Sequence, residues 1–255
     1  MTVDESAERE YRDAVVLSDL HLWDRDEPRY RSALEVLREL PREVDLLVVL
    51  GDLFDFWIEE NVVLVERFAD VIAALAAIRA RGVAVLYCEG NHDLHLEAHF
   101  GRVVGLDTFA GERRLRVAGR EVSLSHGDLV NPRDHGYLFL RWLLRTQVVR
   151  WLARALPAEL VVTIGERSSR KSRGYTARKN DPIRELSHDY ARARIAAGAD
   201  VVVIGHTHRP ERTAIAAANG RQGLYVNTGY WPADGRKTWA RINANGVHLY
   251  ELAAP

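Results

Sequence analysis

The chain has 255 residues, 47% apolar and 28% charged, which is typical of a globular protein with a sizeable core. A formal net charge of −1 excludes a global field that attracts nucleic acid or anionic lipid, so such a partner needs a local basic patch. The single cysteine, Cys88, excludes a disulfide framework and favours a reducing cytosol. The acidic N-terminus does not resemble a signal peptide, and no run of about 18 uncharged apolar residues predicts a membrane-spanning helix.

Short β-rich runs alternate with helical patterns in the first half of the chain. Strands are predicted at 14–18, 45–50 and 83–88, and helices between them near 29–40 and 62–81. We expect the second helix to end at Gly82, where the apolar pattern stops. This alternation predicts an α/β fold with parallel strands.

The second half of the chain is predicted to be richer in strands, with a helical block before most of them. The predicted features are a hairpin at 113–125, a helical block at 133–197 and strands at 200–205, 223–229, 238–242 and 246–252. We expect these strands to form a second sheet with mixed pairing, and "LVVTI" (160–164) could be one more strand. No flexible linker flanks the helical block, so we interpret 133–197 as an insertion within a single domain, 1–255.

Polar side chains that can bind metals follow five of the predicted strands. They occur in Asp19-Leu20-His21, Gly51-Asp52 with Asp55 beyond it, Gly90-Asn91-His92-Asp93, His126-Gly127-Asp128 and Gly205-His206-Thr207-His208. In open α/β sheets, ligands bind in the crevice outside the carboxyl ends of the strands, so these loops are expected to converge.

The residue types in these loops indicate a pair of metal ions. The seven candidate ligands are Asp19, His21, Asp52, Asn91, His126, His206 and His208. Seven ligands are too many for one tetrahedral ion and suit two ions about 3.5–4 Å apart that share a carboxylate. Imidazole and oxygen ligands without thiolate favour Mn, Fe or Zn. Each motif alone is weak evidence, but five of them on five strand ends are very unlikely to arise by coincidence.

As a set, "DLH", "GDLFD", "GNHD", "SHGD" and "GHTH" resemble the motifs of the calcineurin-like metallophosphoesterase superfamily. The resemblance implies two packed mixed β-sheets flanked by helices. By position, it assigns one metal to Asp19, His21, Asp52 and His208, and the other to Asp52, Asn91, His126 and His206. Asp52 would then bridge the ions, and His92, oriented by Asp55, would protonate the leaving oxygen or stabilise developing charge.

The first part of the helical block predicts a cap. Residues 134–157 read as two short helices, broken near Thr146-Gln147 and ended by Pro157. They carry the i, i+4 arginine pairs Arg141/Arg145 and Arg150/Arg154 among apolar and aromatic residues. This pattern suits either a membrane interface with basic flanks or a cap that buries its apolar face on the sheets, and both hold if the cap encloses an apolar chamber.

The second part of the block, 166–180, is basic and rich in serine. Such a segment is usually a solvated face, but beside a phosphoesterase site it could hold a second phosphate. The candidate substrate-binding residues are Tyr137, Arg167, Ser168, Ser169, Arg170, Lys171 and Arg173. Nucleic acid is not expected as a partner, because few aromatic residues accompany the charges.

Longer segments sharpen the resemblance. "SDLHLW", "GDLFDFWIE", "GNHDLH", "SHGDLVNPRDHGY", "SSRKS" and "GHTHRP" look like the UDP-2,3-diacylglucosamine diphosphatase family of lipid A synthesis. That resemblance implies hydrolysis of the pyrophosphate of a UDP-linked, doubly acylated sugar to UMP and 2,3-diacylglucosamine 1-phosphate, with Mn²⁺ as the metal. It further implies a cytoplasmic enzyme that contacts the membrane through its cap.

One residue departs from the best-known branch of that family, which has arginine where this chain has His92. Two other functions therefore stay open. One is a general phosphodiesterase or phosphatase that uses the same site on another substrate. The other is a non-catalytic adaptor, although such proteins usually lose ligands and this chain keeps all seven.

Overall fold

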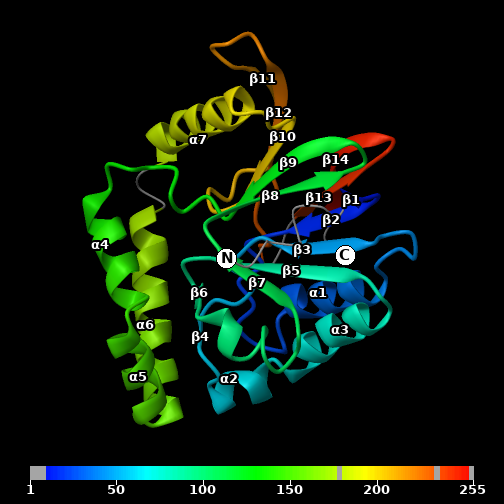
Figure 1. Cartoon of the computed structure of the whole chain (residues 1–255). Helices are drawn as coiled ribbons and strands as arrows, with labels where there is room; N and C mark the ends of the chain where they lie inside the picture. The colour runs from blue at the N-terminus through cyan, green and yellow to red at the C-terminus, as the bar shows by residue number, and fades with distance from the viewer. Residues whose placement is uncertain (1–9, 177–179, 233–235, 253–255) are drawn as a thin grey trace, which may run out of the picture.

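The computed structural model describes residues 10–176, 180–232 and 236–252, except for the side chains of 170–182 and 252. Most of its strands form two six-stranded sheets that pack face to face between helices (Figure 1). The α/β class, the two mixed sheets and the flanking helices agree with the expected fold.

The first sheet carries the parallel strands expected in the first half of the chain. Its order is β14 (Gly246–Leu252), β13 (Lys237–Asn243), β2 (Ala14–Leu17), β3 (Leu46–Val49), β5 (Ala84–Glu89) and β7 (Asp107–Ala110). Neighbouring strands from β2 to β7 pair in parallel, whereas β13 is antiparallel to both β2 and β14. The prediction that all late strands join the second sheet is therefore wrong for β13 and β14.

The second sheet contains the predicted hairpin and three of the later strands. Its order is β1 (Glu10–Tyr11), β8 (Glu112–Val117), β9 (Arg120–Ser125), β10 (Val201–Ile204), β12 (Gln222–Asn227) and β11 (Glu211–Ala216). Strand β9 pairs in parallel with β10 and antiparallel with β8, so the expected mixed pairing is confirmed. Two short strands, β4 (Trp57–Ile58) and β6 (Asp93–Leu94), form a separate ribbon.

Strand periodicity explains the layers. In β2, Val15 and Leu17 face a core shared with α1 and α3, whereas Ala14 and Val16 face the second sheet. Alternate strand residues point to opposite faces, so a strand that is buried on both faces must be apolar throughout. The same rule makes "VVVI" of β10 apolar, since it packs between the first sheet and α7.

Eight helices lie in the described part of the chain. They are α1 (Pro28–Arg38), α2 (Val62–Arg67), α3 (Ala69–Ala80), α4 (His135–Leu144), α5 (Gln147–Ala155), α6 (Ala158–Thr176), α7 (Asn180–Ala196) and a 3₁₀ turn, η2 (Leu96–Ala98). The helix predicted at 62–81 is interrupted at Phe68, which ends α2 and precedes α3. The break near Thr146 is confirmed, because the Thr146 side chain caps α5 by accepting from the Val149 N–H.

The helical block divides between two places. Helix α7 covers the second sheet, whereas α4, α5 and α6 run side by side at one edge of the molecule (Figure 1). The segment 160–164, a possible strand by its sequence, lies within α6 instead. Helix formation there lets Val161 and Val162 bury against the body of the protein. None of the described helices is both long and apolar enough to cross a membrane.

Candidate metal centre

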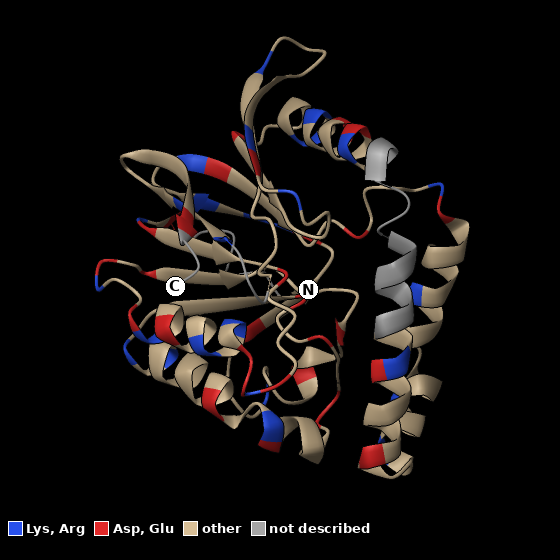
Figure 2. Ribbon diagram, turned by 180° about the vertical axis from the view of Figure 1, so that it is seen from behind, with Lys and Arg blue, Asp and Glu red and all other residues tan. Residues whose placement is uncertain are grey.

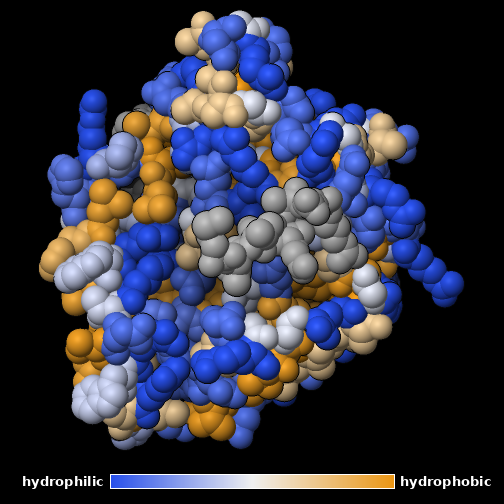
Figure 3. Space-filling model, in the orientation of Figure 1, coloured by the Kyte–Doolittle hydropathy of each residue, from blue (hydrophilic) through white to orange (hydrophobic). Residues whose placement is uncertain are grey.

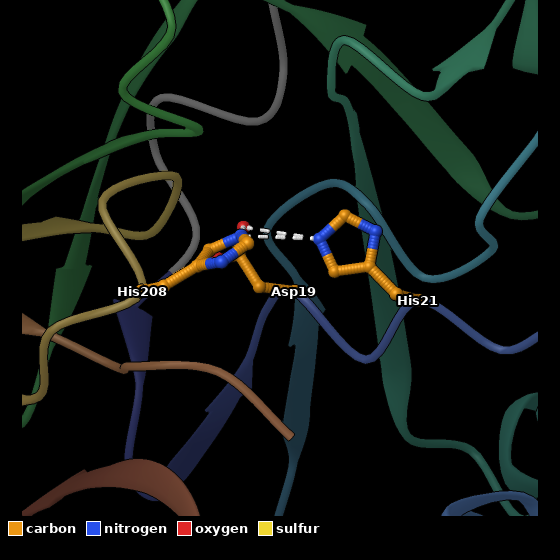
Figure 4. A group of neighbouring side chains, drawn as sticks. All are labelled: Asp19, His21 and His208. Carbon is orange, nitrogen blue, oxygen red and sulfur yellow. Dashed lines mark hydrogen bonds and ion pairs between the residues drawn. The ribbon is translucent and has the colours of Figure 1, made fainter. Parts of the chain in front are cut away.

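The loops after five strands meet at one end of the two sheets. Asp19, His21 and His208 bring one ligand atom each within 4.8 Å of one another (Figure 4), and Asp52, His126 and His206 form a second such group. Asn91 adjoins the second group, because its Oδ1 lies 3.1 Å from His126 Nε2. The structure therefore brings together all seven residues that were predicted as ligands.

Strained backbone positions these side chains. Five of the seven candidate ligands have left-handed φ angles, between 45° and 64°: Asp19, His21, Asp52, His206 and His208. Each such non-glycine residue costs on the order of 1 kcal/mol or more, and strain of this kind concentrates at functional sites. Glycine allows the loops to approach closely, since a Cβ at Gly90 would overlap the Asp52 carboxylate and one at Gly205 would overlap the Asp19 carboxylate.

Asp52 lies between the two groups. Its Oδ1 accepts from the His92 backbone N–H at 2.9 Å, which leaves Oδ2 at 3.4 Å from His126 Nε2 and 3.8 Å from His21 Nε2. Burial disfavours the charged carboxylate, but His126 and His92 outweigh it and hold the pKa of Asp52 well below its ordinary value. An ionised carboxylate with one oxygen facing both groups is the arrangement that a bridging ligand requires.

The atoms of the first group fit a divalent cation. Oδ1 of Asp19 is buried and has no hydrogen bond of good geometry among the described residues. The Nε2 atoms of His21 and His208 face each other at 3.1 Å (Figure 4). Burial lowers the pKa of His21 well below its ordinary value, so its imidazole keeps the lone pair that a metal needs. A cation would satisfy an oxygen and two nitrogens that the described residues leave poorly paired.

The second group fits a cation equally well. His126 Nδ1 lies 2.9 Å from the Leu50 carbonyl oxygen, which can only accept, so Nδ1 carries a proton. Nε2, which faces the Asn91 and Asp52 oxygens, is the nitrogen that would bind a cation. Burial opposes a proton on His126, but Asp52 and Asp19 raise its pKa well above its ordinary value. The same negative field attracts a divalent ion. These buried histidine and aspartate clusters are consistent with a dinuclear metal site.

The sequence interpretation missed one residue that supports the site. The buried Asp93 carboxylate accepts from the backbone N–H groups of Asp52, Leu53 and Gly90 at 2.7–3.0 Å and from the Tyr87 hydroxyl at 2.6 Å. Burial and the nearby Asp52 raise the pKa of Asp93 to about 6. Asp93 therefore joins the Asp52 loop to the Asn91 loop. In the sequence, its position directly after His92 was the signal that could have identified it.

His92 borders the centre without joining either group of predicted ligands. Its ring centroid lies 4.8 Å from that of His21, and its Nδ1 lies 2.9 Å from the Asp55 carbonyl oxygen and 3.0 Å from Ser169 Oγ. The expected contact between His92 and Asp55 exists, but through the backbone of Asp55. The Asp55 carboxylate lies nearer to His21, with Oδ1 at 3.7 Å from Nδ1.

A cavity of about 280 Å³, here called the apolar cavity, opens beside His92. Asn91 and His92 lie at its base, Phe56 and Ile58 line the body side, and α4, α5 and α6 supply the opposite wall. Helix α6 approaches closely, because Gly165 faces the Phe56 ring where a Cβ would overlap it. Apolar side chains thus extend from the candidate metal centre beneath three helices.

The four arginines of α4 and α5 bind acidic residues of the body. Arg141 pairs with Asp128 at 2.7 Å and Arg145 with Glu89 at 3.2 Å, while Arg150 and Arg154 both pair with Glu59. The sequence left two interpretations of these helices open, a membrane interface with basic flanks or a cap packed on the sheets. In the structure, the pairs attach the helices to the body of the protein. Figure 2 shows these helices at one edge of the molecule, beside loops of the body that carry acidic residues.

The predicted substrate-binding residues fall into three sets. Tyr137, Ser168 and Ser169 line the apolar cavity, and the Tyr137 hydroxyl donates to Asp128 at 2.5 Å. Arg167 is exposed on α6, outside the lining of that cavity. The side chains of Arg170, Lys171 and Arg173 lie outside the described residues.

Comparison with known proteins agrees with this geometry. The family described as "Calcineurin-like phosphoesterase" matches residues 14–210, which include all seven candidate ligands and His92. The chain therefore belongs to the calcineurin-like phosphoesterases, a family of metal-dependent enzymes.

Similar proteins carry names that are more specific than the family description. A protein of Azotobacter vinelandii named UDP-2,3-diacylglucosamine hydrolase is 30% identical over 237 residues, covering 92% of this chain and 96% of that protein. One of Aeromonas salmonicida with the same name is 34% identical over 202 residues, 77% of each chain. Among solved structures, a Vps29 double mutant of Entamoeba histolytica is 12% identical with a TM-score of 0.44, covering 95% of this chain and 99% of that one.

Proposed function

We propose that this protein hydrolyses the pyrophosphate of UDP-2,3-diacylglucosamine, releasing UMP and 2,3-diacylglucosamine 1-phosphate. The observation that carries the proposal is the apolar cavity with Asn91 and His92 at its base. A substrate with acyl chains next to a phosphate needs an apolar chamber beside a phosphoryl-transfer centre, and this cavity has that position. The names of the relatives support the same substrate.

The protein's own residues supply binding, orientation and a proton. One Mn²⁺ would be held by Asp19, His21, Asp52 and His208. The other would be held by Asp52, Asn91, His126 and His206. When bound, such ions lower the pKa of a water and neutralise phosphate charge. Because the Asp55 carbonyl accepts from His92 Nδ1, Nε2 is the nitrogen left to give a proton to the leaving oxygen. Ser169 also contacts Nδ1 and helps to fix the ring.

The substrate test compares an acylated with an unacylated nucleotide sugar. Purified protein loaded with Mn²⁺ should release UMP from UDP-2,3-diacylglucosamine far faster than from UDP-N-acetylglucosamine. Equal turnover of the two would contradict the proposal, and preferential cleavage of cyclic nucleotides or single-stranded DNA would replace it with a general phosphodiesterase function.

Two neighbouring residues of α6 give a matched pair of variants. Both side chains are exposed, but Ile164 lines the apolar cavity and Thr163 does not. Ile164→Asn should lower turnover of the acylated substrate, because acyl chains would then meet a polar amide. Thr163→Asn should leave it unchanged. Equal effects of the two variants on turnover would show that the apolar cavity does not bind the acyl chains.

We further propose that α4 and α5 contact the inner face of the cytoplasmic membrane, which would make the enzyme cytoplasmic and peripheral. Phe139, Trp142, Val148 and Trp151 are each more than half exposed, and Figure 3 shows apolar side chains gathered along this edge. Since the arginines of these helices bind Asp128, Glu89 and Glu59, attraction should be mainly hydrophobic.

Vesicle flotation tests this contact. Binding should be similar for zwitterionic and anionic vesicles, should change little with salt, and should fall when Trp142 and Trp151 are both changed to Ala. Binding that requires anionic lipid and disappears at high salt would contradict a hydrophobic contact and indicate free basic residues instead.

A further inference from the structure

A second cavity, here called the polar cavity, also borders the candidate metal centre. It has a volume of about 440 Å³, within the range of small-molecule sites, and its walls include His208, Tyr230, Arg236, Tyr250 and Glu251. It shares no lining residue with the apolar cavity. His208 belongs both to this wall and to the first metal-binding group, so a phosphate held at that group would lie directly beside the polar cavity.

One aromatic ring with a well-defined position lines the polar cavity. The Tyr230 ring stacks on His208 with centroids 4.7 Å apart and an interplanar angle of 13°. Tyr250 is also a wall residue, but its ring stacks on Trp239, on the face of the β13–β14 pair opposite to Glu251. A ring held from behind by another ring loses little freedom when a planar group stacks on its front face. The walls therefore suit a planar, aromatic ligand.

The charges of the polar cavity disfavour a second phosphate. Arg236 is the only lysine or arginine among its described lining residues, and its Nε lies 2.8 Å from Glu251 Oε1. A cation that is already paired attracts a phosphate weakly, and the carboxylate repels it. The same pair offers donors and acceptors to hydroxyl and amide groups, as does the Thr238 hydroxyl.

We propose that the polar cavity binds the nucleoside end of the substrate, a pyrimidine ribonucleoside. This inference rests on the proposed function for the identity of the substrate. The phosphates would lie at the metal centre, the acyl chains in the apolar cavity, and the base and ribose in the polar cavity. The Tyr230 ring would stack on the base, while Arg236, Thr238 and Glu251 would bind its amide or the ribose hydroxyls.

Direct binding measurements test the nucleoside site without a lipid substrate. Isothermal titration calorimetry of the Mn²⁺-loaded protein would compare UMP with methyl phosphate, which has the phosphate alone. We expect UMP to bind at least about tenfold more tightly. Tyr230→Ala, with both ligands measured on the same variant, should reduce that advantage by about 5- to 150-fold or abolish it, which is the range that stacking of one base gives.

A second variant and a control complete the test. Arg236→Ala should also reduce the advantage of UMP, whereas Arg221→Ala, which removes an exposed arginine paired with Asp200 elsewhere on the surface, should preserve it. Equal affinity of the wild type for UMP and methyl phosphate would overturn the inference. So would an unchanged UMP advantage in both Tyr230→Ala and Arg236→Ala.

The result separates this inference from the proposed function. If the wild type binds UMP through Tyr230 but does not cleave UDP-2,3-diacylglucosamine, the nucleoside site stands and the lipid assignment fails. If it cleaves that substrate but UMP has no advantage over methyl phosphate, the proposed function stands and the nucleoside site is refuted.

Discussion

Glu59 is the main anchor of α5, so neutralising it should loosen that helix. The Glu59 side chain is 3% exposed and its backbone adopts a left-handed φ of 53°. Arg154 contacts its Oε2 through Nη2 at 2.7 Å and through Nε at 3.1 Å, while Arg150 binds its Oε1. Glu59→Gln keeps the shape of the side chain but removes the charge that both arginines share.

The size of the effect follows from the exposure of each pair. A hydrogen bond to a charged group contributes about 1.5–3 kcal/mol. Arg154 is 55% exposed, so its contribution falls toward that of a surface pair, about 0–1 kcal/mol, whereas Arg150 is 24% exposed and retains more. Since glutamine still accepts a hydrogen bond, we expect a loss of about 2 kcal/mol, or about 30-fold in the equilibrium between docked and undocked α5.

Hydrogen exchange measures this equilibrium residue by residue. Amides in the second half of α5 should exchange about 30-fold faster in Glu59→Gln, with those of α1 unchanged. Asp189→Asn is the matched control, because its partner Arg192 is also an arginine but both side chains are largely exposed, and it should change little. Protection of α5 within about threefold of the wild type would refute the role of Glu59.

Acid should have the same effect as the substitution. Burial tends to raise the pKa of Glu59, but Arg150 and Arg154 outweigh it and lower the pKa below its ordinary value of 4.5. The stabilisation is therefore complete above about pH 4.5 and is lost as the pH falls through the lowered value. Protection factors of α5 should fall on acidification in the wild type and be flatter with pH in Glu59→Gln.

The remaining predictions concern the centre itself. Asp52→Asn should lower the metal content at both positions, measured by elemental analysis. The control Asp70→Asn, at an exposed residue, should not lower it. Full metal occupancy in Asp52→Asn would exclude a bridging role. His92→Ala should keep both metals but slow turnover by about 10²–10⁴, and undiminished turnover would move the proton donor elsewhere. Ser169→Ala should shift the pH profile of kcat without changing metal content, since only the Asp55 carbonyl would then hold His92 Nδ1; an identical profile would argue against positioning by Ser169.

Strands that are buried on both faces were predicted most directly from the sequence. In β3 and β10 every residue is apolar and buried, so composition alone identifies them. Strands β7 and β11 were missed because "DTFA" and "ERTAIA" are partly exposed and mix polar with apolar residues. Such strands are stabilised chiefly by pairing with a neighbour, which a local pattern does not contain.

The candidate ligands were predictable because glycine and strand ends mark them locally, whereas the contacts of the helices were not. The i, i+4 spacing places Arg150 and Arg154 on one face of α5, and a basic face beside apolar residues suits lipid or a protein surface equally. Only the fold shows that Glu59 lies opposite that face, 91 and 95 residues away in the chain. A long-range ion pair leaves no periodic signal.

These long-range contacts connect the helices to the chemistry. Arg141 of α4 binds Asp128, two residues after His126, and Arg145 donates to the Gly90 carbonyl, directly before Asn91. Together with the Ser169 contact to His92, these bonds connect the helices directly to two loops of the candidate centre, those after β5 and β9. A chain shortened at 138–156 would therefore lose more than a surface for acyl groups. Because Asp128 and Glu89 would remain without their arginines, even a small chromogenic ester should be cleaved more slowly than by the intact protein.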